Sequence, residues 1–195
     1  MTVRIGITGG IGSGKSFVCR LIEQRLGVEV YDCDSAAKRI MRTSPQLRQQ
    51  LTALIGPDAY DGTLLNKAAI ARFLLASPEN AHALESIVHP AVFADFEASG
   101  QQWVESAIMY ESGLNRLVDR VVVVTAPEEV RIERVMRRDG ISAEKAHQWI
   151  ARQLPQDELL RRADYEIVND GLLPLLPQLD SILSTLPTSN HRPSV

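Results

Sequence analysis

The sequence predicts an α/β protein in which a mostly parallel sheet lies between helices on both of its faces. Short apolar runs alternate along the chain with segments of helical periodicity, as they do in consecutive βαβ units. The strongest strand signal is V-V-V-V-T at 121–125, where uniform β-branching indicates an interior strand. The chain has 195 residues, enough for one substantial core with small attached subdomains.

The chain begins with a strand, a glycine-rich turn and a helix. The buried strand is predicted over 3–8, and apolar residues at helical spacing predict the helix over 17–26. A second short strand is predicted over 28–31. The acidic pair of the sequence D-C-D, Asp32 and Asp34, follows it directly.

The middle of the chain has a different pattern. Residues 45–99 read as helical segments separated by turns at X-Pro pairs, including His89–Pro90, and we expect an inserted helical region there. Alternation then resumes. The further predicted strands cover 103–108, 121–125 and 165–168. A helix is predicted to begin near Pro127 and to continue as a basic helix over 130–138, where D-G ends it. A helix from Ser142 and a final apolar helix to about Leu186 complete the prediction.

The charge of the chain argues against a polyanionic partner. Its formal net charge is -3 and its isoelectric point is near 5.8. A nucleic acid bound by a broad basic surface is therefore not expected, and any anionic ligand must be bound locally.

Cysteine content and hydropathy indicate the compartment. Cys19 and Cys33 are too few for a disulfide framework and lack zinc-ligand spacing, so we expect both to be reduced and buried. The N-terminus enters a strand-like run without a secretory signal pattern, and no apolar stretch approaches the roughly 20 residues that span a bilayer. We expect a cytoplasmic protein with no membrane partner.

The glycine-rich turn carries the first functional motif. It reads G-G-I-G-S-G-K-S over 9–16 and matches G-x-x-x-x-G-K-[ST] between a predicted strand and a predicted helix. Without Cβ atoms the backbone can bring its amides to phosphate oxygens, and the start of the helix adds its positive dipole end. Lys15 supplies charge for the β- and γ-phosphates, and the Ser16 hydroxyl binds Mg²⁺. The residues expected to bind the nucleotide here are Gly10, Ile11, Gly12, Ser13, Gly14, Lys15 and Ser16.

The spacing of this motif selects among ligands. A dinucleotide fingerprint would need its third glycine at Lys15, so the predicted ligand is a nucleoside triphosphate and the predicted core is of the P-loop NTPase type. A GTP-driven switch is the weaker alternative, because D-x-x-G is absent and the only N-K pair is followed by Ala68 and Ala69. The signature loop and strand-end Asp of a transport ATPase are absent as well. Phosphoryl transfer to a second molecule remains.

A kinase needs a base for the acceptor hydroxyl, and the D-C-D pair supplies candidates. Both carboxylates stand at the exit of the second strand, where open α/β sheets bind ligands. We assign Asp34 as the base, and Asp32 can act on Mg²⁺ through water. The alternative is that Asp34 merely caps the helix that starts at Ser35.

A kinase also needs cations around the transferred phosphoryl group. In the segment R-I-E-R-V-M-R-R-D, Arg131, Arg134 and Arg138 fall near one face of the predicted helix, and Arg137 points elsewhere. The alternative is a solvated, arginine-rich surface in which Glu133 pairs with its neighbours.

The string of motifs resembles the dephospho-CoA kinase family over nearly the whole chain. The matching pieces are G-I-T-G-G-I-G-S-G-K-S, Y-D-C-D, I-V-H-P, E-S-A-I-M-Y-E-S-G, R-V-M-R-R-D-G-I-S, Gln153 and A-D-Y-E-I-V-N-D-G. The resemblance implies transfer of the γ-phosphate of ATP to the ribose 3′-hydroxyl of dephospho-coenzyme A, the last step of coenzyme A synthesis. A nucleotide or nucleoside kinase of similar fold is the alternative among enzymes.

The resemblance also implies three functional parts. The nucleotide-binding core is expected to comprise 1–34, 101–136 and 161–187, with a helical region for the acceptor at 35–100 and a small helical lid at 137–160. A tail, 188–195, is expected to be frayed. The oligomeric state is not readable from the sequence, with a monomer slightly favoured.

Several single residues receive roles through the resemblance. Asp34 matches the proposed catalytic base, and Arg134 and Arg138 match lid-side arginines that meet phosphates. Asn169 and Gly171 match the N-x-G at the adenine end of the nucleotide site. His89 falls on the His-Pro near the acceptor, and a buried histidine bonded to backbone is its equally good structural interpretation.

This sequence departs from the family pattern in two places. One is the motif D-x-P-L-L-F-E, and the other is the residue after the first Asp of D-x-D, which is commonly alanine. The first acid of the former motif is Glu105 and its proline is replaced by Ala107; the longer carboxylate can still hold Mg²⁺ or its waters, or have a structural role. Cys33 stands where the family commonly has alanine, and we expect it to pack.

Overall fold

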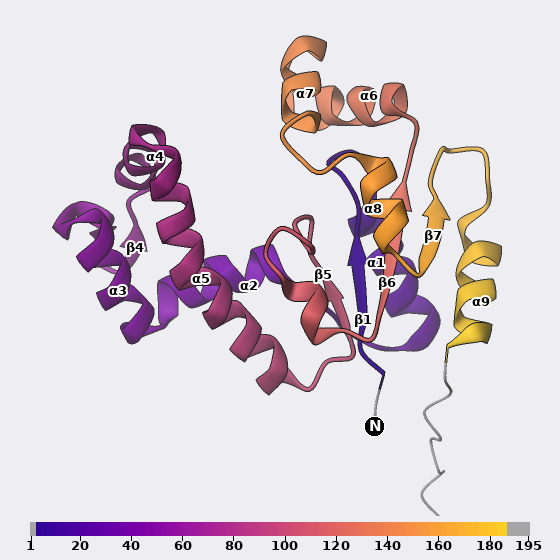
Figure 1. Ribbon diagram of the computed structural model, residues 1–195, viewed down its shortest axis with the longest axis horizontal. Coiled ribbons are helices and arrows are strands. Elements are labelled where there is room, and N and C mark those ends of the chain that lie inside the picture. The colour runs from indigo at the N-terminus through magenta and orange to yellow at the C-terminus, as the bar shows by residue number, and fades with distance from the viewer. Residues whose placement is uncertain (1–2, 187–195) are drawn as a thin grey trace, which may run out of the picture. The chain divides into compact units, whose positions relative to one another are not determined.

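The computed structural model describes residues 3–186, which divide into two compact units. The first unit comprises the chain up to Tyr31 and from Gln101 onward, and the second comprises Asp32–Gly100. Figure 1 labels the elements. The predicted fraying of 188–195 lies outside the described residues.

A five-stranded sheet in the order β2-β5-β1-β6-β7 carries the fold. β1 pairs in parallel with β5 and with β6, and β6 pairs in parallel with β7. Parallel neighbours need crossover connections, which is why strands and helices alternate in the sequence. The α/β class is therefore confirmed. The strands are β1 (Ile5–Thr8), β2 (Val30–Asp32), β5 (Trp103–Glu105), β6 (Arg120–Thr125) and β7 (Tyr165–Val168).

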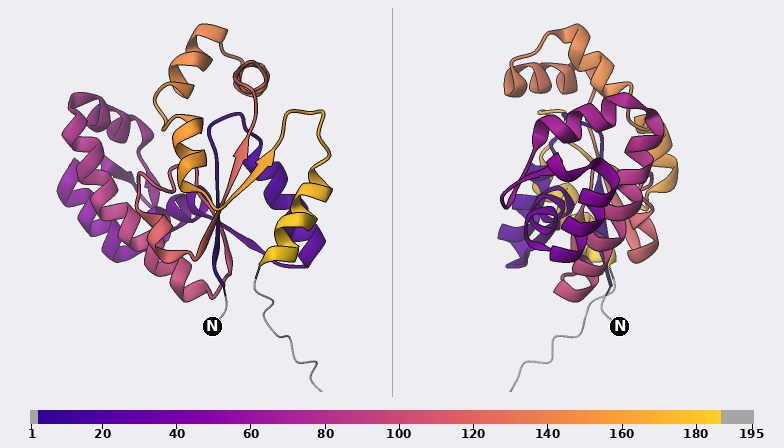
Figure 2. Two further views of the ribbon diagram at one scale, coloured as in Figure 1. Left: turned by 45° about the vertical axis from the view of Figure 1, so that its right-hand side comes forward. Right: turned by 90° about the vertical axis from the view of Figure 1, so that its left-hand side faces the viewer.

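Helices cover both faces of this sheet. Figure 2 shows α1 (Lys15–Leu26) and α9 (Leu175–Thr185) on one face and α8 (Gln156–Arg162) on the other. Each buries an apolar stripe, and Ile7 and Ile22 are fully buried where α1 meets the sheet. In the first unit this gives three layers.

Two further helices lie beyond the carboxyl ends of the strands (Figure 1). They are α6 (Glu128–Asp139), which ends at Gly140 in the left-handed region, and α7 (Ala143–Ile150), which Ser142 caps through its Oγ. Both boundaries follow the sequence signals. A short 3₁₀ helix, η2 (Leu114–Leu117), lies between β5 and β6.

The second unit is largely helical. Side-chain caps define four of its helix starts, because Asp32, Ser44, Asn66 and Ser77 each accept a hydrogen bond from a first-turn amide. Its elements are α2 (Cys33–Thr43), α3 (Pro45–Ile55), η1 (Pro57–Ala59), β3 (Tyr60–Asp61), β4 (Leu64–Leu65), α4 (Lys67–Ala76) and α5 (Pro78–Ser99).

The predicted turn at His89–Pro90 is wrong, because α5 continues through Pro90. Proline removes one helical hydrogen bond. Val88, Val92 and Phe96 are nevertheless buried along one face of the helix, and this burial outweighs the lost bond.

Three smaller expectations also need correction. The antiparallel pair β3–β4 was not predicted, since strands of two residues leave almost no periodic signal. The strand predicted over 103–108 ends at Glu105, and turns follow it. Cys33 is only partly buried, because it begins α2 at the exit of the sheet, whereas Cys19 is buried as expected.

No helix within residues 3–186 is both long and apolar enough to cross a bilayer.

Candidate active site

The glycine-rich loop joins the carboxyl end of the central strand β1 to α1. Gly12 and Gly14 have φ values of 80° and 90°, a region that side chains strongly disfavour. Gly14 is the N-cap of α1 and makes no side-chain cap hydrogen bond. The amides of Phe17 and Val18 donate to the Gly14 carbonyl oxygen, which leaves those of Lys15 and Ser16 at the helix start for an anion, and the helix dipole favours one there.

Lys15 lies inside this loop and is only 9% exposed. Its Nζ donates to the carbonyl oxygen of Gly9 at 2.7 Å and to that of Gly10 at 3.5 Å. Burial lowers the pKa of Lys15, and the nearby Glu105 acts in the opposite direction. The ammonium thus stands at the loop with little hydration, where a phosphate would meet an unscreened charge.

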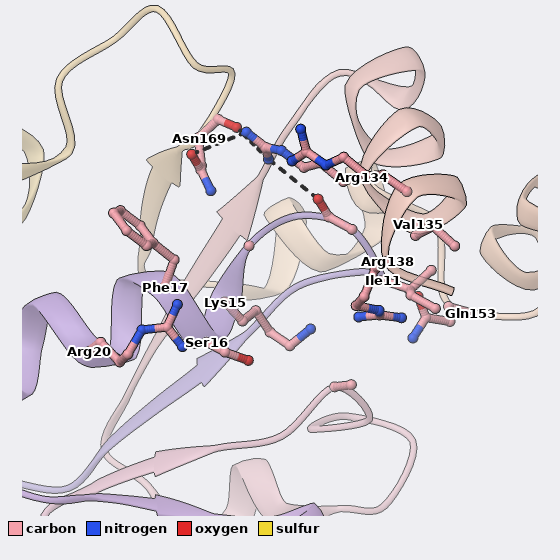
Figure 3. Close-up of a pocket in the computed structure, with 14 residues that line it drawn as sticks. Ile11, Lys15, Ser16, Phe17, Arg20, Arg134, Val135, Arg138, Gln153 and Asn169 are labelled. Carbon is pink, nitrogen blue, oxygen red and sulfur yellow. Dashed lines mark hydrogen bonds between the residues drawn. The ribbon is translucent and has the colours of Figure 1, made fainter. Parts of the chain in front are cut away.

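Arg134 of α6 reaches across the loop. Its Nη1 donates to the carbonyl oxygen of Asn169 at 2.9 Å and, at 3.4 Å each, to the carbonyl oxygens of Gly12 and Ser13 (Figure 3). Arg138, one turn later, pairs with the carboxylate of Asp139 at 2.7 Å and keeps 60% of its side chain exposed. Arg138 can therefore turn toward a bound phosphate at small cost, since an exposed ion pair is weak.

The predicted orientation of Arg137 is wrong, because Arg137 lines the same pocket as Arg134 and Arg138. Arg131 faces the glycine loop as Arg134 does, but it is not among the described lining residues of the pocket. Arg131 is 6% exposed and donates from Nε to the carbonyl oxygen of Ile11 at 2.9 Å. A loop carbonyl inside the protein needs a donor, and Arg131 supplies it.

Asn169 follows β7 and is buried. Its Nδ2 donates to the carbonyl oxygen of Ser13 at 2.8 Å, and its main-chain N–H donates to the carbonyl oxygen of Thr125. The next residue, Asp170, accepts from the amides of Leu172 and Leu173, which folds N-D-G into a tight turn. In this turn Gly171 has φ of 88°. The turn thereby lies beside the glycine loop.

The acidic pair lies at the start of α2. Asp32 is the N-cap: its Oδ1 accepts from the amides of Asp34 and Ser35, and its Oδ2 accepts from the Ser35 hydroxyl. The alternative that Asp34 caps this helix is therefore wrong, because Asp32 already satisfies these donors. Asp34 is 76% exposed and forms an ion pair with Lys38, one turn along the helix.

His89 lies in α5 of the helical unit. Its ring stacks on Phe93 with centroids 6.2 Å apart, and burial lowers its pKa. A neutral, half-buried ring of this kind suits both of the interpretations drawn from the sequence.

Magnesium can be tested against the side chains present. Within residues 3–186 no group of three or more His, Cys, Asp or Glu side chains could hold a metal ion. Mg²⁺ at a triphosphate is held mainly by phosphate oxygens and water, with one or two protein oxygens. The exposed Ser16 at the start of α1, and Glu105 at the end of β5, whose charge acts on Lys15, fit that need. Asp32, engaged as a cap, fits only through water.

The glycine loop, the arginines of α6 and the turn after β7 border one pocket of about 880 Å³ in the first unit (Figure 3). It brings together eight residues expected from the sequence: Ile11, Gly12, Gly14, Lys15, Ser16, Arg134, Arg138 and Asn169. Of the other predicted residues, Gly10, Ser13, Glu105 and Gly171 belong to the same unit without being among the described lining residues, and Asp32, Asp34 and His89 belong to the helical unit.

Sequence reasoning gave no role to Phe17, Arg20, Ala107, Val135 and Gln153, which also line the pocket. One signal was available. Phe17 is apolar but falls outside the apolar stripe of α1, and it is 48% exposed with the Arg20 guanidinium 5.8 Å from its ring centroid. An exposed aromatic residue one step after a phosphate loop indicates a site wall.

The fold and the site together define a P-loop phosphotransferase. A glycine loop follows the central strand of a mostly parallel sheet, a buried lysine lies within the loop, and arginines of a following helix face the same pocket. The chain belongs to the dephospho-CoA kinase family, whose model matches residues 3–174.

Relatives extend this match to nearly the full length. The dephospho-CoA kinases of Bacteroides fragilis strain YCH46 and of Porphyromonas gingivalis are each 41% identical, covering 98% of this chain and 96% and 98% of theirs. A crystal structure from Thermus thermophilus is 34% identical, has a TM-score of 0.80, and covers 95% of this chain and 98% of that one.

More distant structures support the fold alone. A shikimate kinase from Acinetobacter baumannii, solved in complex with shikimate, is 20% identical with a TM-score of 0.57, covering 96% of this chain and 97% of that one.

Proposed function

We propose that this protein is an ATP-dependent kinase that phosphorylates the 3′-hydroxyl of dephospho-coenzyme A, giving coenzyme A and ADP. This would be the last step of coenzyme A synthesis. The observation that carries the proposal is the match of the dephospho-CoA kinase model across residues 3–174, a range that includes the whole pocket around Lys15.

The glycine loop binds the triphosphate in this proposal. Amides of the loop and of the start of α1 donate to the β- and γ-phosphates, and the Lys15 ammonium leaves its carbonyl partners to meet them. The phosphates compensate the poor hydration of the ammonium, because an anion takes the place of the missing water.

Ser16, Glu105 and, through water, Asp32 would hold Mg²⁺ against the triphosphate. Bound there, Mg²⁺ would supply positive charge that neutralises the phosphate oxygens.

Asp34 accepts the proton of the acceptor hydroxyl. Since Asp32 caps α2, the Asp34 carboxylate is left to this task and to Lys38, its exposed partner. Removal of Lys38 from Asp34 costs little, because both side chains are exposed to water. The acceptor is bound by the helical region 35–100, where His89 contacts it.

The arginines complete the electrostatic environment. Arg134, fixed at the loop, and Arg138, in a lid of 137–160, stabilise the charge on the transferred phosphoryl group. Asn169 and Gly171, in the turn after β7, bind the adenine end of the nucleotide. Residues 1–34, 101–136 and 161–187 form the nucleotide-binding core.

We further propose that the protein acts in the cytoplasm, with no nucleic acid as partner. The low cysteine content and the net charge of -3 support these parts of the proposal.

The test is an acceptor panel with Mg-ATP, in which ADP release is followed with dephospho-CoA, CoA, AMP, CMP and nucleosides. CoA is the matched control, because it differs from dephospho-CoA only in already carrying the 3′-phosphate. We expect ADP release with dephospho-CoA and only background with the others. Turnover of AMP without turnover of dephospho-CoA would support a nucleotide kinase, and GTP preference without acceptor-dependent turnover would support a switch.

A further inference from the structure

The tip of the glycine loop is held by side chains from distant parts of the chain. Ile11 donates its N–H to Oε1 of Gln153 at 2.6 Å, and its carbonyl oxygen accepts from Nε of Arg131 at 2.9 Å. Gln153 lies between α7 and α8, and Arg131 lies in α6. Both main-chain polar groups of one loop residue are thus bound by side chains, where most loops leave them to water.

The Ile11 side chain is held as well. It packs against a small apolar cluster that joins α6 to α7, formed by Ile132, Val135 and Ala146. All three are buried, and Ala146 is 0% exposed. The loop tip is therefore joined to this pair of helices by apolar contact in addition to two hydrogen bonds.

The position of Arg131 also explains why two residues of the loop must be glycine. A Cβ on Gly10 would lie 2.8 Å from Cζ of Arg131, and a Cβ on Gly12 would lie 2.5 Å from the Arg131 carbonyl oxygen. Both distances are too short for real contacts. These glycines let the loop approach α6 closely, a requirement separate from the approach of phosphate.

We propose that Arg131 and Gln153 are positioning residues, which act through Ile11 to fix the loop in its phosphate-binding conformation before nucleotide arrives. The inference rests on the proposed function to the extent that a nucleotide binds at this loop. Because the loop is already ordered in the folded protein, nucleotide binding does not have to order it, and the anchors raise nucleotide affinity by holding Ile11.

Two substitutions at Arg131 separate position from charge. Glutamine carries an N–H donor on the same side-chain carbon that bears Nε in arginine, so Arg131→Gln keeps the bond to Ile11 and loses the charge. Arg131→Met loses both. We expect binding of Mg-ADP, measured by calorimetry on the full chain, to weaken about tenfold in Arg131→Met and about threefold or less in Arg131→Gln. Equal weakening in both would overturn the positioning role, since charge alone would then matter.

The second part of the test is Gln153→Met, which removes the acceptor of the Ile11 N–H. Gln153 lies outside any helix or strand, so the substitution does not interrupt one. We expect about tenfold weaker binding of Mg-ADP and of inorganic pyrophosphate. In the double variant with Arg131→Met the losses should be less than additive, because both side chains hold one residue. Wild-type affinity in Gln153→Met at unchanged melting temperature would contradict the proposal.

The two proposals can fail separately. Binding of Mg-ADP is measured without acceptor, so a wild-type protein that binds ADP but leaves dephospho-CoA unphosphorylated defeats the proposed function alone. Should Arg131→Met not fold, Arg131→Gln and Gln153→Met carry the test.

Discussion

At the scale of single residues, Lys15 lowers the stability of the folded protein and prepares the site for a phosphate. Its ammonium is buried, and burial lowers its pKa, so the folded protein holds the charged form at a cost in free energy. Its hydrogen bond to the carbonyl of Gly9 offsets only part of that cost, about 1 kcal/mol. Strain of this kind is expected where a ligand will later relieve it.

We predict that Lys15→Met leaves the ligand-free protein as stable as wild type or more stable, while stabilisation by Mg-ADP is lost. Below the lowered folded pKa the lysine is charged in both the folded and the unfolded state, so its burial penalty is fully present there. Between the lowered folded pKa and the unfolded value of 10.5 the unfolded state binds more protons, so wild-type stability rises with pH and the advantage of the variant shrinks. Thermal melts at pH 7 and pH 10 check this. A ligand-free melting temperature lower by more than about 5 °C would make Lys15 structural.

Tyr110 supplies a second prediction. Its hydroxyl is buried without a hydrogen-bond partner among residues 3–186. Burial and the negative charge of Asp164 raise the pKa of Tyr110 to about 12. The Arg162 guanidinium, which lies over the ring, acts in the opposite direction and lowers this pKa. Tyr110→Phe keeps the ring and removes an unsatisfied polar atom. We expect the variant to be about 1 kcal/mol more stable at pH 7.

The pH dependence of this pair follows from the same pKa. Above pH 10 the unfolded tyrosine ionises while the folded one stays neutral up to about pH 12, so wild-type stability falls in that interval. The advantage of Tyr110→Phe should therefore grow by about 1 kcal/mol between pH 8 and pH 11, as measured by urea unfolding. A variant less stable at pH 7 would show that the hydroxyl has a partner in solution.

At the scale of elements, the start of α2 separates two neighbouring carboxylates. Asp32 holds the first-turn donors of the helix, and Asp34 lies exposed beside Lys38. Asp32 thus has a structural role, and the chemical role that we propose falls to Asp34, two positions along.

We predict that substitution of Asp32 affects stability and that substitution of Asp34 affects turnover. Asp32→Ala removes the cap and should lower stability by about 1 kcal/mol. Asp34→Asn should leave stability within about 0.5 kcal/mol and lower kcat with dephospho-CoA about a hundredfold or more, with ATP affinity little changed. Denaturant titration and steady-state rates of both variants check this. An Asp34→Asn enzyme with more than about a tenth of wild-type turnover would exclude Asp34 as the base.

The elements predicted well are those with strong local signals. Glycine at the end of α6, Ser142 at the start of α7 and the β-branched run of β6 each fix a boundary by local chemistry. The remaining features depend on long-range packing. Pro90 stays within a helix because its neighbours are buried, and Arg131 turns inward because a loop more than a hundred residues away needs a donor. No local pattern contains that information.

At the scale of the molecule, the residues with proposed roles are distributed over two units. The first contains the pocket around the loop, and the second contains Asp34 and His89. The sequence predicted the loop, because backbone geometry and spacing define it. It did not predict the wall of Phe17 and Arg20: the position of Phe17 outside the apolar stripe of α1 indicates an exposed aromatic residue, but only the folded structure shows that both side chains line this pocket.

The central claim is that the loop around Lys15 directs the γ-phosphate of ATP to one hydroxyl of the acceptor. The most direct test is ³¹P NMR of the product formed from Mg-ATP and dephospho-CoA, with Lys15→Met as the control. The account predicts a new monoester on the ribose 3′-oxygen and one ADP for each, both absent with the variant. ADP formed without that monoester, or phosphate attached at another position, would contradict it.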